Sequence, residues 1–137
     1  MDAICFRDRS VQFQMKSVDR ELLKAYTSFF PQGKGASYEF GIATGNWGCG
    51  AFNGDRQLKG IIQLMAASEV ARPLIYAAFG DKDLVTSFSD VYDYLRQQGA
   101  TVGDLYSYLN QYAHRHKESS LFDFILQTPV SSIRSKF

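Results

Sequence analysis

Thr44-Gly45-Asn46-Trp47-Gly48-Cys49-Gly50-Ala51-Phe52-Asn53-Gly54-Asp55 is a stretch that carries four of the chain's 11 glycines. Glycine has no Cβ and tolerates positive φ, so clustered glycines allow backbone N–H groups to converge. A loop of this kind that leads into a helix is typical of sites for phosphate or diphosphate groups. The same composition also fits a plain connection with tight turns, so both interpretations stay open at this point.

The segments on either side of the loop predict a βαβ unit. Residues 38–44 read as a strand that enters the loop, and residues 55–69 read as a helix. The apolar residues of this helix recur at helical spacing and form a core-facing stripe: Leu58, Ile61, Ile62 and Met65. Residues 73–79 form a short apolar run of the kind expected for a buried strand. We expect parallel strands, with the loop and Phe79 at their carboxyl ends, where such sheets bind ligands.

The rest of the chain predicts further helices around this unit. Residues 1–6 read as a short strand, and Ser17 is a candidate cap for a helix over residues 18–30. Two more helices are expected before and after Gly99, the second capped by Thr101 with Asp104 three residues later. The length of 137 residues suits one compact domain. We place that domain at residues 1–126 and expect a loose, polar tail at residues 127–137.

Composition limits the class of partner. The formal net charge is +1, so no large basic surface predicts nucleic-acid binding. The N-terminus does not resemble a signal peptide, and no apolar run is long enough to span a membrane, so we expect a soluble intracellular protein. Cys5 and Cys49 do not have CxxC spacing and are expected to be free thiols. His114 and His116 lie two residues apart on a predicted helix and face different sides, so no metal site is expected.

Two familiar nucleotide-binding motifs do not fit the loop. It lacks the Gly-Lys-Ser/Thr of a Walker A loop. Gly48, Gly50 and Gly54 form G-x-G-x-x-x-G, one residue longer than the dinucleotide fingerprint, and no acidic residue ends the second strand. A nucleotide-dependent oxidoreductase is therefore an alternative that this spacing disfavours.

The side chains in and near the loop each allow two interpretations. An aromatic ring there can stack on a base or ribose, and Asn46 can bind a hydroxyl or phosphate group. Trp47 can instead pack inward as part of the core, and Phe79 can be a buried strand residue. If Phe79 offers its face to a nucleobase, such stacking is worth roughly 1–3 kcal/mol per base. Lys34, between two glycines, is interpreted as a loop charge.

No general acid is evident near the loop. The glutamates are dispersed, and none lies in a Gly-rich segment: Glu21, Glu39, Glu69 and Glu118. Asp55 is expected to cap the helix that follows the loop, and Asp81 is expected to close a turn. Catalysis by this chain alone is therefore not predicted from its residues.

The run from Ala43 to Phe52 closely resembles the C-terminal part of poly(ADP-ribose) glycohydrolase. The resemblance extends to short matches on both sides of the run: Asp2-Ala3, the helix around Arg20 to Tyr26, Gly54-Asp55, Leu58-Lys59, Phe79-Gly80-Asp81 and Thr101-Val102-Gly103-Asp104. It covers roughly residues 1–126. It implies an α/β, partial macrodomain-like fold, in which helices flank a βαβ unit with parallel strands.

The resemblance also implies ADP-ribose as the ligand and names the residues that bind it. The substrate-binding candidates are Gly45, Asn46, Gly48, Cys49, Gly50, Ala51, Phe52 and Phe79. The loop would hold the diphosphate through Asn46 and backbone amides, Phe52 would lie near a ribose, and Phe79 would stack by the adenine. The implied partners are poly(ADP-ribose) and the proteins that carry it, in the nucleus or cytoplasm, with no cofactor, metal or membrane involved.

The chain departs from the family's pattern at the catalytic residues. The family's signature is a Gly-Gly-Gly loop followed by Gln-Glu-Glu, upstream of the segment seen here, and this sequence contains neither. Glycoside hydrolysis needs a placed carboxylic acid, so the 137-residue chain is expected to be inactive, and poorly stable because its sheet edges are open. A non-catalytic ADP-ribose-binding module and a truncated gene product without function are the alternatives. Asn53 also stands where the family often has glycine.

Overall fold

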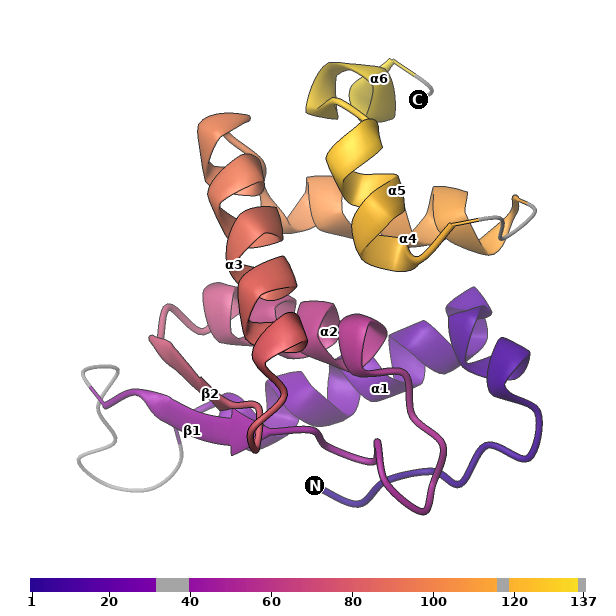
Figure 1. Ribbon diagram of the computed structural model, residues 1–137. Helices are drawn as coiled ribbons and strands as arrows, with labels where there is room; N and C mark the ends of the chain where they lie inside the picture. Colours follow the sequence, from indigo (N-terminus) through magenta and orange to yellow (C-terminus); the bar gives the residue numbers. More distant parts are fainter. Residues whose placement is uncertain (32–39, 116–118, 136–137) are drawn as a thin grey trace. The chain divides into compact units, whose positions relative to one another are not determined.

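The computed structural model describes residues 1–31, 40–115 and 119–135 (Figure 1). The chain divides into two compact units, Met1–Phe79 and Gly80–Phe137. The loop and both predicted strands belong to the first unit, which therefore holds the candidate site. The sequence predicts a single domain up to residue 126, whereas the structure places a division at Phe79.

The first unit is built on the predicted βαβ arrangement. Its elements are η1 (Arg9–Phe13), α1 (Met15–Phe29), β1 (Ile42–Gly45), α2 (Arg56–Glu69) and β2 (Leu74–Ala77). Strands β1 and β2 pair in parallel, with Ile42 opposite Leu74 and Gly45 opposite Ala77. The predicted α/β class and the parallel strands are confirmed. Residues 32–35 of the predicted loop, Tyr38 and Glu39 of the predicted strand, and the candidate Lys34 lie outside the described residues.

Helix α2 is the central element of this unit. It packs against α1, and its buried residues lie on all sides, as expected for a helix enclosed by its neighbours. Two polar side chains, Lys59 and Gln63, are almost completely buried within it. A buried amine and a buried amide are costly without hydrogen-bond partners, so both side chains are expected to bind other polar groups.

Helix α1 begins earlier than its sequence predicts. Gln14 precedes its first turn, and Ser17, the candidate cap, lies inside the helix. Arg72 links the C-terminal end of α1 to the segment just before β1. Its guanidinium donates to the carbonyl oxygens of Phe29 (2.7 Å) and Phe40 (2.8 Å). No strand forms in residues 1–6, although Phe6 bonds to the loop.

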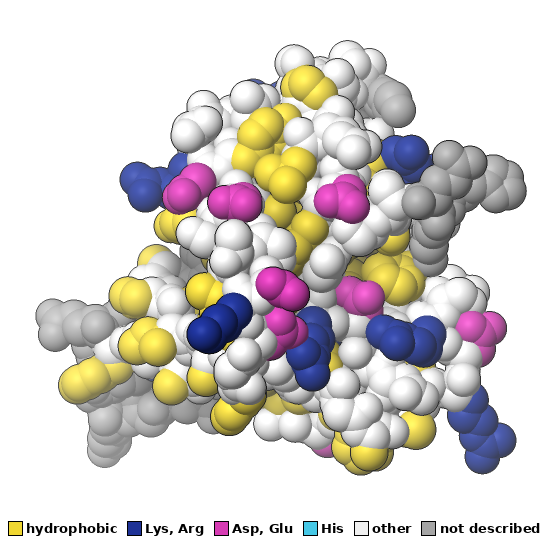
Figure 2. Space-filling model, in the orientation of Figure 1, with side chains coloured by type: hydrophobic (Ala, Val, Ile, Leu, Met, Phe, Trp, Pro, Cys, Tyr) yellow, Lys and Arg dark blue, Asp and Glu magenta, His cyan; other side chains and the backbone are white. Residues whose placement is uncertain are grey.

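One face of the sheet is exposed, contrary to the prediction of a buried strand. Ile75 is 63% exposed, and Ala43 and Ala77 on the same face are also exposed. Within the described residues the sheet has two strands, so alternate side chains along β2 have no layer above them. Hydrophobic side chains gather over the part of the unit that holds β1 and β2, at the lower left of Figure 2.

The second unit is entirely helical over its described residues. It contains α3 (Lys82–Gln97), α4 (Val102–Ala113), α5 (Leu121–Gln127) and α6 (Val130–Arg134). Thr101 and Asp104 form the predicted capping box at the start of α4. Phe88 of α3 packs edge-on against Phe122 of α5. None of the helices in the described ranges is long and apolar enough to cross a membrane.

The prediction of a loose tail is wrong for the described part of residues 127–137. Val130 and Ile133 of α6 are buried, and Arg134 pairs with Asp104 at 2.7 Å. The apolar pair and the ion pair hold this short helix against α4. The sequence does not predict α6, because most of its residues are polar and the helix spans little more than one turn.

Candidate functional site

The loop between β1 and α2 folds back on itself through its own backbone. Trp47 N–H donates to Gly45 O (2.8 Å), Cys49 N–H to Asn46 O (3.1 Å), and Gly54 N–H to Gly48 O (2.8 Å). These bonds close successive turns, so the loop is a defined structure rather than an extended connection.

Several backbone amides of the loop have no partner among the described residues. In residues 1–31, 40–115 and 119–135, no hydrogen-bond acceptor meets the backbone N–H groups of Gly48, Gly50, Ala51 or Phe52. The amide of Cys49, a predicted contact, is already engaged in a turn. Unpaired amides in a glycine-rich turn can bind an anion, so these four are stronger candidates than Cys49.

The glycines of the loop have different structural roles. A Cβ on Gly54 would lie 2.5 Å from Gly48 O, so the backbone there requires glycine. Gly48 has φ +69°, and a Cβ on it would lie 3.0 Å from the Ala3 methyl group. At Gly50, by contrast, a Cβ would meet nothing within 4 Å. Gly50 is therefore the loop glycine whose side is open to a ligand.

Phe79 is not a buried strand residue. Its side chain is 82% exposed, and its φ of +51° lies in the left-handed region that non-glycine residues rarely adopt. A Cβ on Gly45 would lie 2.7 Å from Phe79 Cε2, so the ring rests directly on Gly45. An exposed ring that a strained backbone holds at the start of the loop could serve as a surface on which a ligand stacks.

Buried and half-buried polar side chains hold the start of the loop. Tyr76 of β2 donates its hydroxyl to Asn46 Oδ1 at 2.7 Å. Gln63 of α2 donates to Gly45 O (3.0 Å) and contacts Thr44 Oγ1 at 2.5 Å. The Tyr76 bond orients the amide of Asn46 through its oxygen, and the Gln63 bonds fix the backbone just before it.

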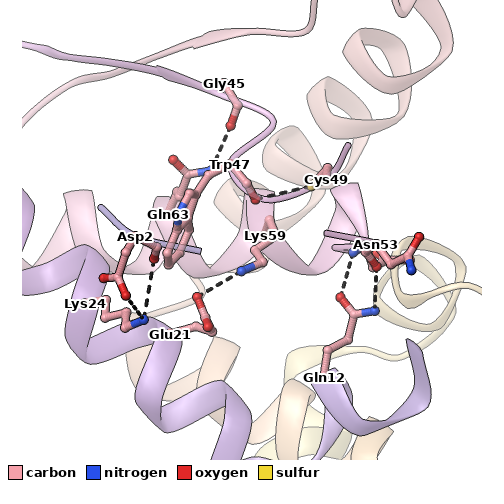
Figure 3. A network of polar contacts seen from close by, with 11 residues as sticks. Asp2, Gln12, Glu21, Lys24, Gly45, Trp47, Cys49, Asn53, Lys59 and Gln63 are labelled. Atoms are coloured by element: carbon pink, nitrogen blue, oxygen red, sulfur yellow. Dashed lines mark hydrogen bonds and ion pairs between the residues drawn. The ribbon is translucent and has the colours of Figure 1, made fainter. Parts of the chain in front are cut away.

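The underside of the loop rests on a buried ion pair (Figure 3). Lys59 Nζ lies 2.9 Å from Glu21 Oε2 and 3.9 Å from the centre of the Trp47 ring. Trp47 is half-buried and turns its ring toward Lys59, so it lies between the two interpretations: it packs inward but is not a fully buried core residue. Its ring meets a cation there, which the sequence did not indicate.

The chain's N-terminal segment lies along the other side of the loop. Phe6 N–H donates to Phe52 O (3.0 Å), and Asn53 Nδ2 donates to Phe6 O (3.2 Å). Gln12 of η1 accepts from Asp55 N–H (2.6 Å) and donates to Asn53 O (3.3 Å). The loop is therefore fixed from both sides before any ligand arrives.

The N-terminus of α2 is already capped by its own carboxylate. Asp55 Oδ1 accepts from Leu58 N–H at 2.9 Å, which confirms the predicted cap. A negative cap at this position competes with an anionic ligand for the same helix end. The loop amides, rather than the helix terminus, are therefore the donors available to an anion.

The Cys49 thiol and the carboxylate of Asp81 both have a defined local state. Burial raises the pKa of Cys49 to about 11, so the group is a protonated thiol at neutral pH. Asp81, expected to close a turn, instead caps α3 by accepting from Leu84 N–H. No cluster of three metal-ligating side chains occurs in the part of the chain that is described. His114 is exposed, and His116 and Glu118 lie outside that part.

The structure brings most of the predicted binding residues together on one loop, with Phe79 beside them. Phe52 is 46% exposed at the far side of this loop, and its role near a ribose stays a prediction. Sequence reasoning missed the residues that hold the loop in place: Gln12, Glu21, Lys59, Gln63 and Tyr76. The one usable signal was the presence of Lys59 and Gln63 in a helix whose neighbours are nearly all apolar.

Comparison with known proteins shows the family to which the chain belongs. The family model described as poly(ADP-ribose) glycohydrolase, macro domain fold, matches residues 1–86. Poly(ADP-ribose) glycohydrolase 1 of Caenorhabditis elegans is 37% identical over 132 residues, which cover 91% of this chain and 17% of the relative. Poly(ADP-ribose) glycohydrolase 1 of Arabidopsis thaliana is 38% identical over 99 residues, covering 70% of this chain and 18% of that protein.

A third relative has a different kind of name. The A-kinase anchor protein SPHKAP of Mus musculus is 30% identical over 112 residues, or 78% of this chain and 7% of the relative. The chain thus spans less than a fifth of the length of each of these three proteins. Because the family model matches more than half of its residues, and two glycohydrolases resemble it over most of its length, the chain belongs to the poly(ADP-ribose) glycohydrolase family.

Proposed function

We propose that the loop and Phe79 form the diphosphate- and adenine-binding wall of an ADP-ribose site. One observation carries this proposal: loop amides without a partner in the described part of the chain and an exposed aromatic ring lie at the same end of the parallel strands. The ring of Phe79 rests on Gly45, the residue at which the loop begins. Amides suit a diphosphate and an aromatic face suits a purine, so the pair matches the two ends of an adenosine diphosphate.

The intact reaction would be hydrolysis of the ribose–ribose bonds of poly(ADP-ribose), with poly(ADP-ribosyl)ated proteins as partners. That reaction needs a carboxylic acid to protonate the leaving oxygen. The nearest carboxylate in the loop, Asp55, is engaged as a helix cap. The sequence contains no Gly-Gly-Gly loop with Gln-Glu-Glu, so we propose that this chain holds the ligand without cutting the polymer.

Binding can be tested by calorimetric titration of the full 137-residue chain with ADP-ribose. Gly50→Val places bulk in the open space beside the unpaired amides and is expected to weaken binding at least ~tenfold. Phe79→Ala removes the stacking surface and is expected to weaken it by roughly 1–3 kcal/mol. Gly103→Ala, whose Cβ makes only ordinary contact in α4, is the control. No heat with the unaltered chain, or an unchanged affinity in both loop variants, would refute the site.

A non-catalytic ADP-ribose-binding module is the second candidate function. The observation that favours it is the relative named as an anchor protein rather than a hydrolase. Incubation of the purified chain with poly(ADP-ribose) tests whether it cuts the polymer, and we expect no ADP-ribose to be released in either case. Release of ADP-ribose would show that the chain supplies its own acid. Binding of NAD in preference to ADP-ribose would favour the nucleotide-dependent oxidoreductase instead.

A further inference from the structure

A buried charge pair lies behind the loop, close to Gly48. Glu21 comes from α1 and Lys59 from α2, and their side chains are only 3% and 1% exposed. Figure 3 shows Lys59 between Glu21 on one side and the loop residues Trp47 and Cys49 on the other. The pair therefore joins the helical layer to the loop.

Stability does not explain why charges occupy these positions. A buried ion pair is often no more stabilising than apolar side chains of similar volume, because both charges lose their hydration. In addition, two buried polar atoms beside the ion pair, Glu21 Oε1 and Trp47 Nε1, have no hydrogen-bond partner in the described part of the chain. Val18 and Ala25, on the same helix as Glu21, show that apolar residues are buried readily there. The charges consequently suggest a role outside folding.

The ammonium end of the pair is the end that approaches the loop. A Cβ built on Gly48 would lie 3.6 Å from Lys59 Nζ, so the cation sits just behind the backbone of that glycine. The amide of Gly48 is one of those left unpaired. Phe6 and Trp47 cover the ammonium with their rings, at 5.7 and 3.9 Å, and exclude water from it. A charge enclosed in this way acts at longer range than one in water and is weakly screened by salt.

We propose that Lys59 makes the loop selective for anionic ligands without touching them, and that Glu21 positions its ammonium group. The pair forms a dipole whose positive end lies behind the backbone of Gly48, one of the candidate amides. It favours a diphosphate over an uncharged group of similar shape, and it adds to the hydrogen bonds of the loop. This inference rests on the proposed function, because it requires the diphosphate to lie on the loop.

The test replaces the pair with apolar residues of similar size in the full chain. Glu21→Leu combined with Lys59→Met is expected to fold at least as stably as the unaltered protein. NMR titration would compare ADP-ribose with adenosine, which has no phosphate group. We expect the double variant to bind ADP-ribose about tenfold more weakly and adenosine within about twofold of the original affinity. Lys59→Arg keeps the charge and is expected to keep the preference for ADP-ribose.

Each other outcome has a definite meaning. Unchanged ADP-ribose affinity in a folded double variant would overturn the inference. An equal loss for ADP-ribose and adenosine, or a double variant that fails to fold, would show that the pair acts only on structure. If the unaltered chain binds neither compound, the proposed function fails first, and that result is distinct from a loss confined to the variant.

Discussion

The glycines of the loop differ in how much space each has for a side chain, and the glycine spacing in the sequence does not show this. Gly54 lies against the carbonyl of Gly48 and leaves no room for a Cβ, whereas Gly50 faces open space. Asn53 has φ +61°, a conformation that glycine adopts freely and asparagine tolerates better than most residues. Asparagine can therefore occupy this position, although the resemblance implies that glycine is common there. Substitutions in one loop therefore separate effects on folding from effects on binding.

The folding requirement of Gly54 gives a prediction at this scale. Gly54→Ala is expected to destabilise the chain by about 1–3 kcal/mol, because its Cβ would overlap the Gly48 carbonyl and force the loop to shift. Urea unfolding followed by circular dichroism measures the loss. Gly50→Ala is the matched control in the same loop and should change stability by no more than about 0.5 kcal/mol. Equal stability of the two variants would show that the Gly48 carbonyl does not lie close enough to Gly54 to exclude a Cβ.

At the scale of elements, helices α4 and α6 of the second unit are joined by an ion pair between side chains near their ends. Asp104 accepts from Thr101 N–H at the start of α4 and from Arg134 of α6 at 2.7 Å. The hydrogen bond from Arg134, followed by those from Thr101, lowers the pKa of Asp104 to about 2, although burial opposes the shift. One carboxylate thus caps one helix and holds another.

This carboxylate predicts a dependence of stability on pH. Because the folded pKa lies below the ordinary value near 4, the contribution of Asp104 is present in full above about pH 4. It should disappear as the pH falls toward 2. Asp104→Asn is expected to lower stability by about 1 kcal/mol or more at pH 7, and the difference should shrink near pH 2. Thermal unfolding of both proteins across this range measures it.

A partner variant checks the cause of that dependence. Arg134→Met removes the donor that lowers the pKa of Asp104 most and should reproduce much of the loss at pH 7. A difference between Asp104→Asn and the original protein that stays constant from pH 7 to pH 2 would contradict the assignment.

At the scale of the whole molecule, each of the two units has its own buried core, but the sheet of the first has an exposed apolar face. Ile75 is 63% exposed on this face, and Phe40, which lies just before β1, is 72% exposed. Paired strands that expose apolar side chains and unpaired edges favour association between chains. The expectation of limited stability from open sheet edges agrees with this feature and stays untested.

Self-association through this face is therefore predicted. Ile75→Thr keeps a β-branched residue in β2 but removes apolar surface, so it is expected to lower the tendency to aggregate without a large loss of stability. Light scattering over a range of protein concentrations measures the effect. Val85→Thr, at a 57% exposed position in α3, is the control and should have little influence. If both variants behave like the original chain, the sheet face is not the route of association.

The local patterns of the sequence were sufficient for much of the fold. The sequence predicts helix α2, its cap at Asp55 and the capping box at Thr101, because each depends on residues a few positions apart. It predicts the parallel strands from the order strand, helix, strand. Membership of the family was also readable, because a long and unusual run around the loop is a property of the chain itself. The position of the loop at the carboxyl end of β1 followed from the order of these elements.

Contacts between distant segments settled the rest. Glu21 and Lys59 are 38 positions apart, and Gln12 reaches Asn53 across 41, so no local pattern indicates either pair. The exposure of Phe79 depends on a left-handed turn after β2 and on the lack of a side chain at Gly45. Which amides stay unpaired depends on how the loop turns back on itself. These features arise from packing in three dimensions, and together they define the proposed ligand-binding surface and the charge beneath it.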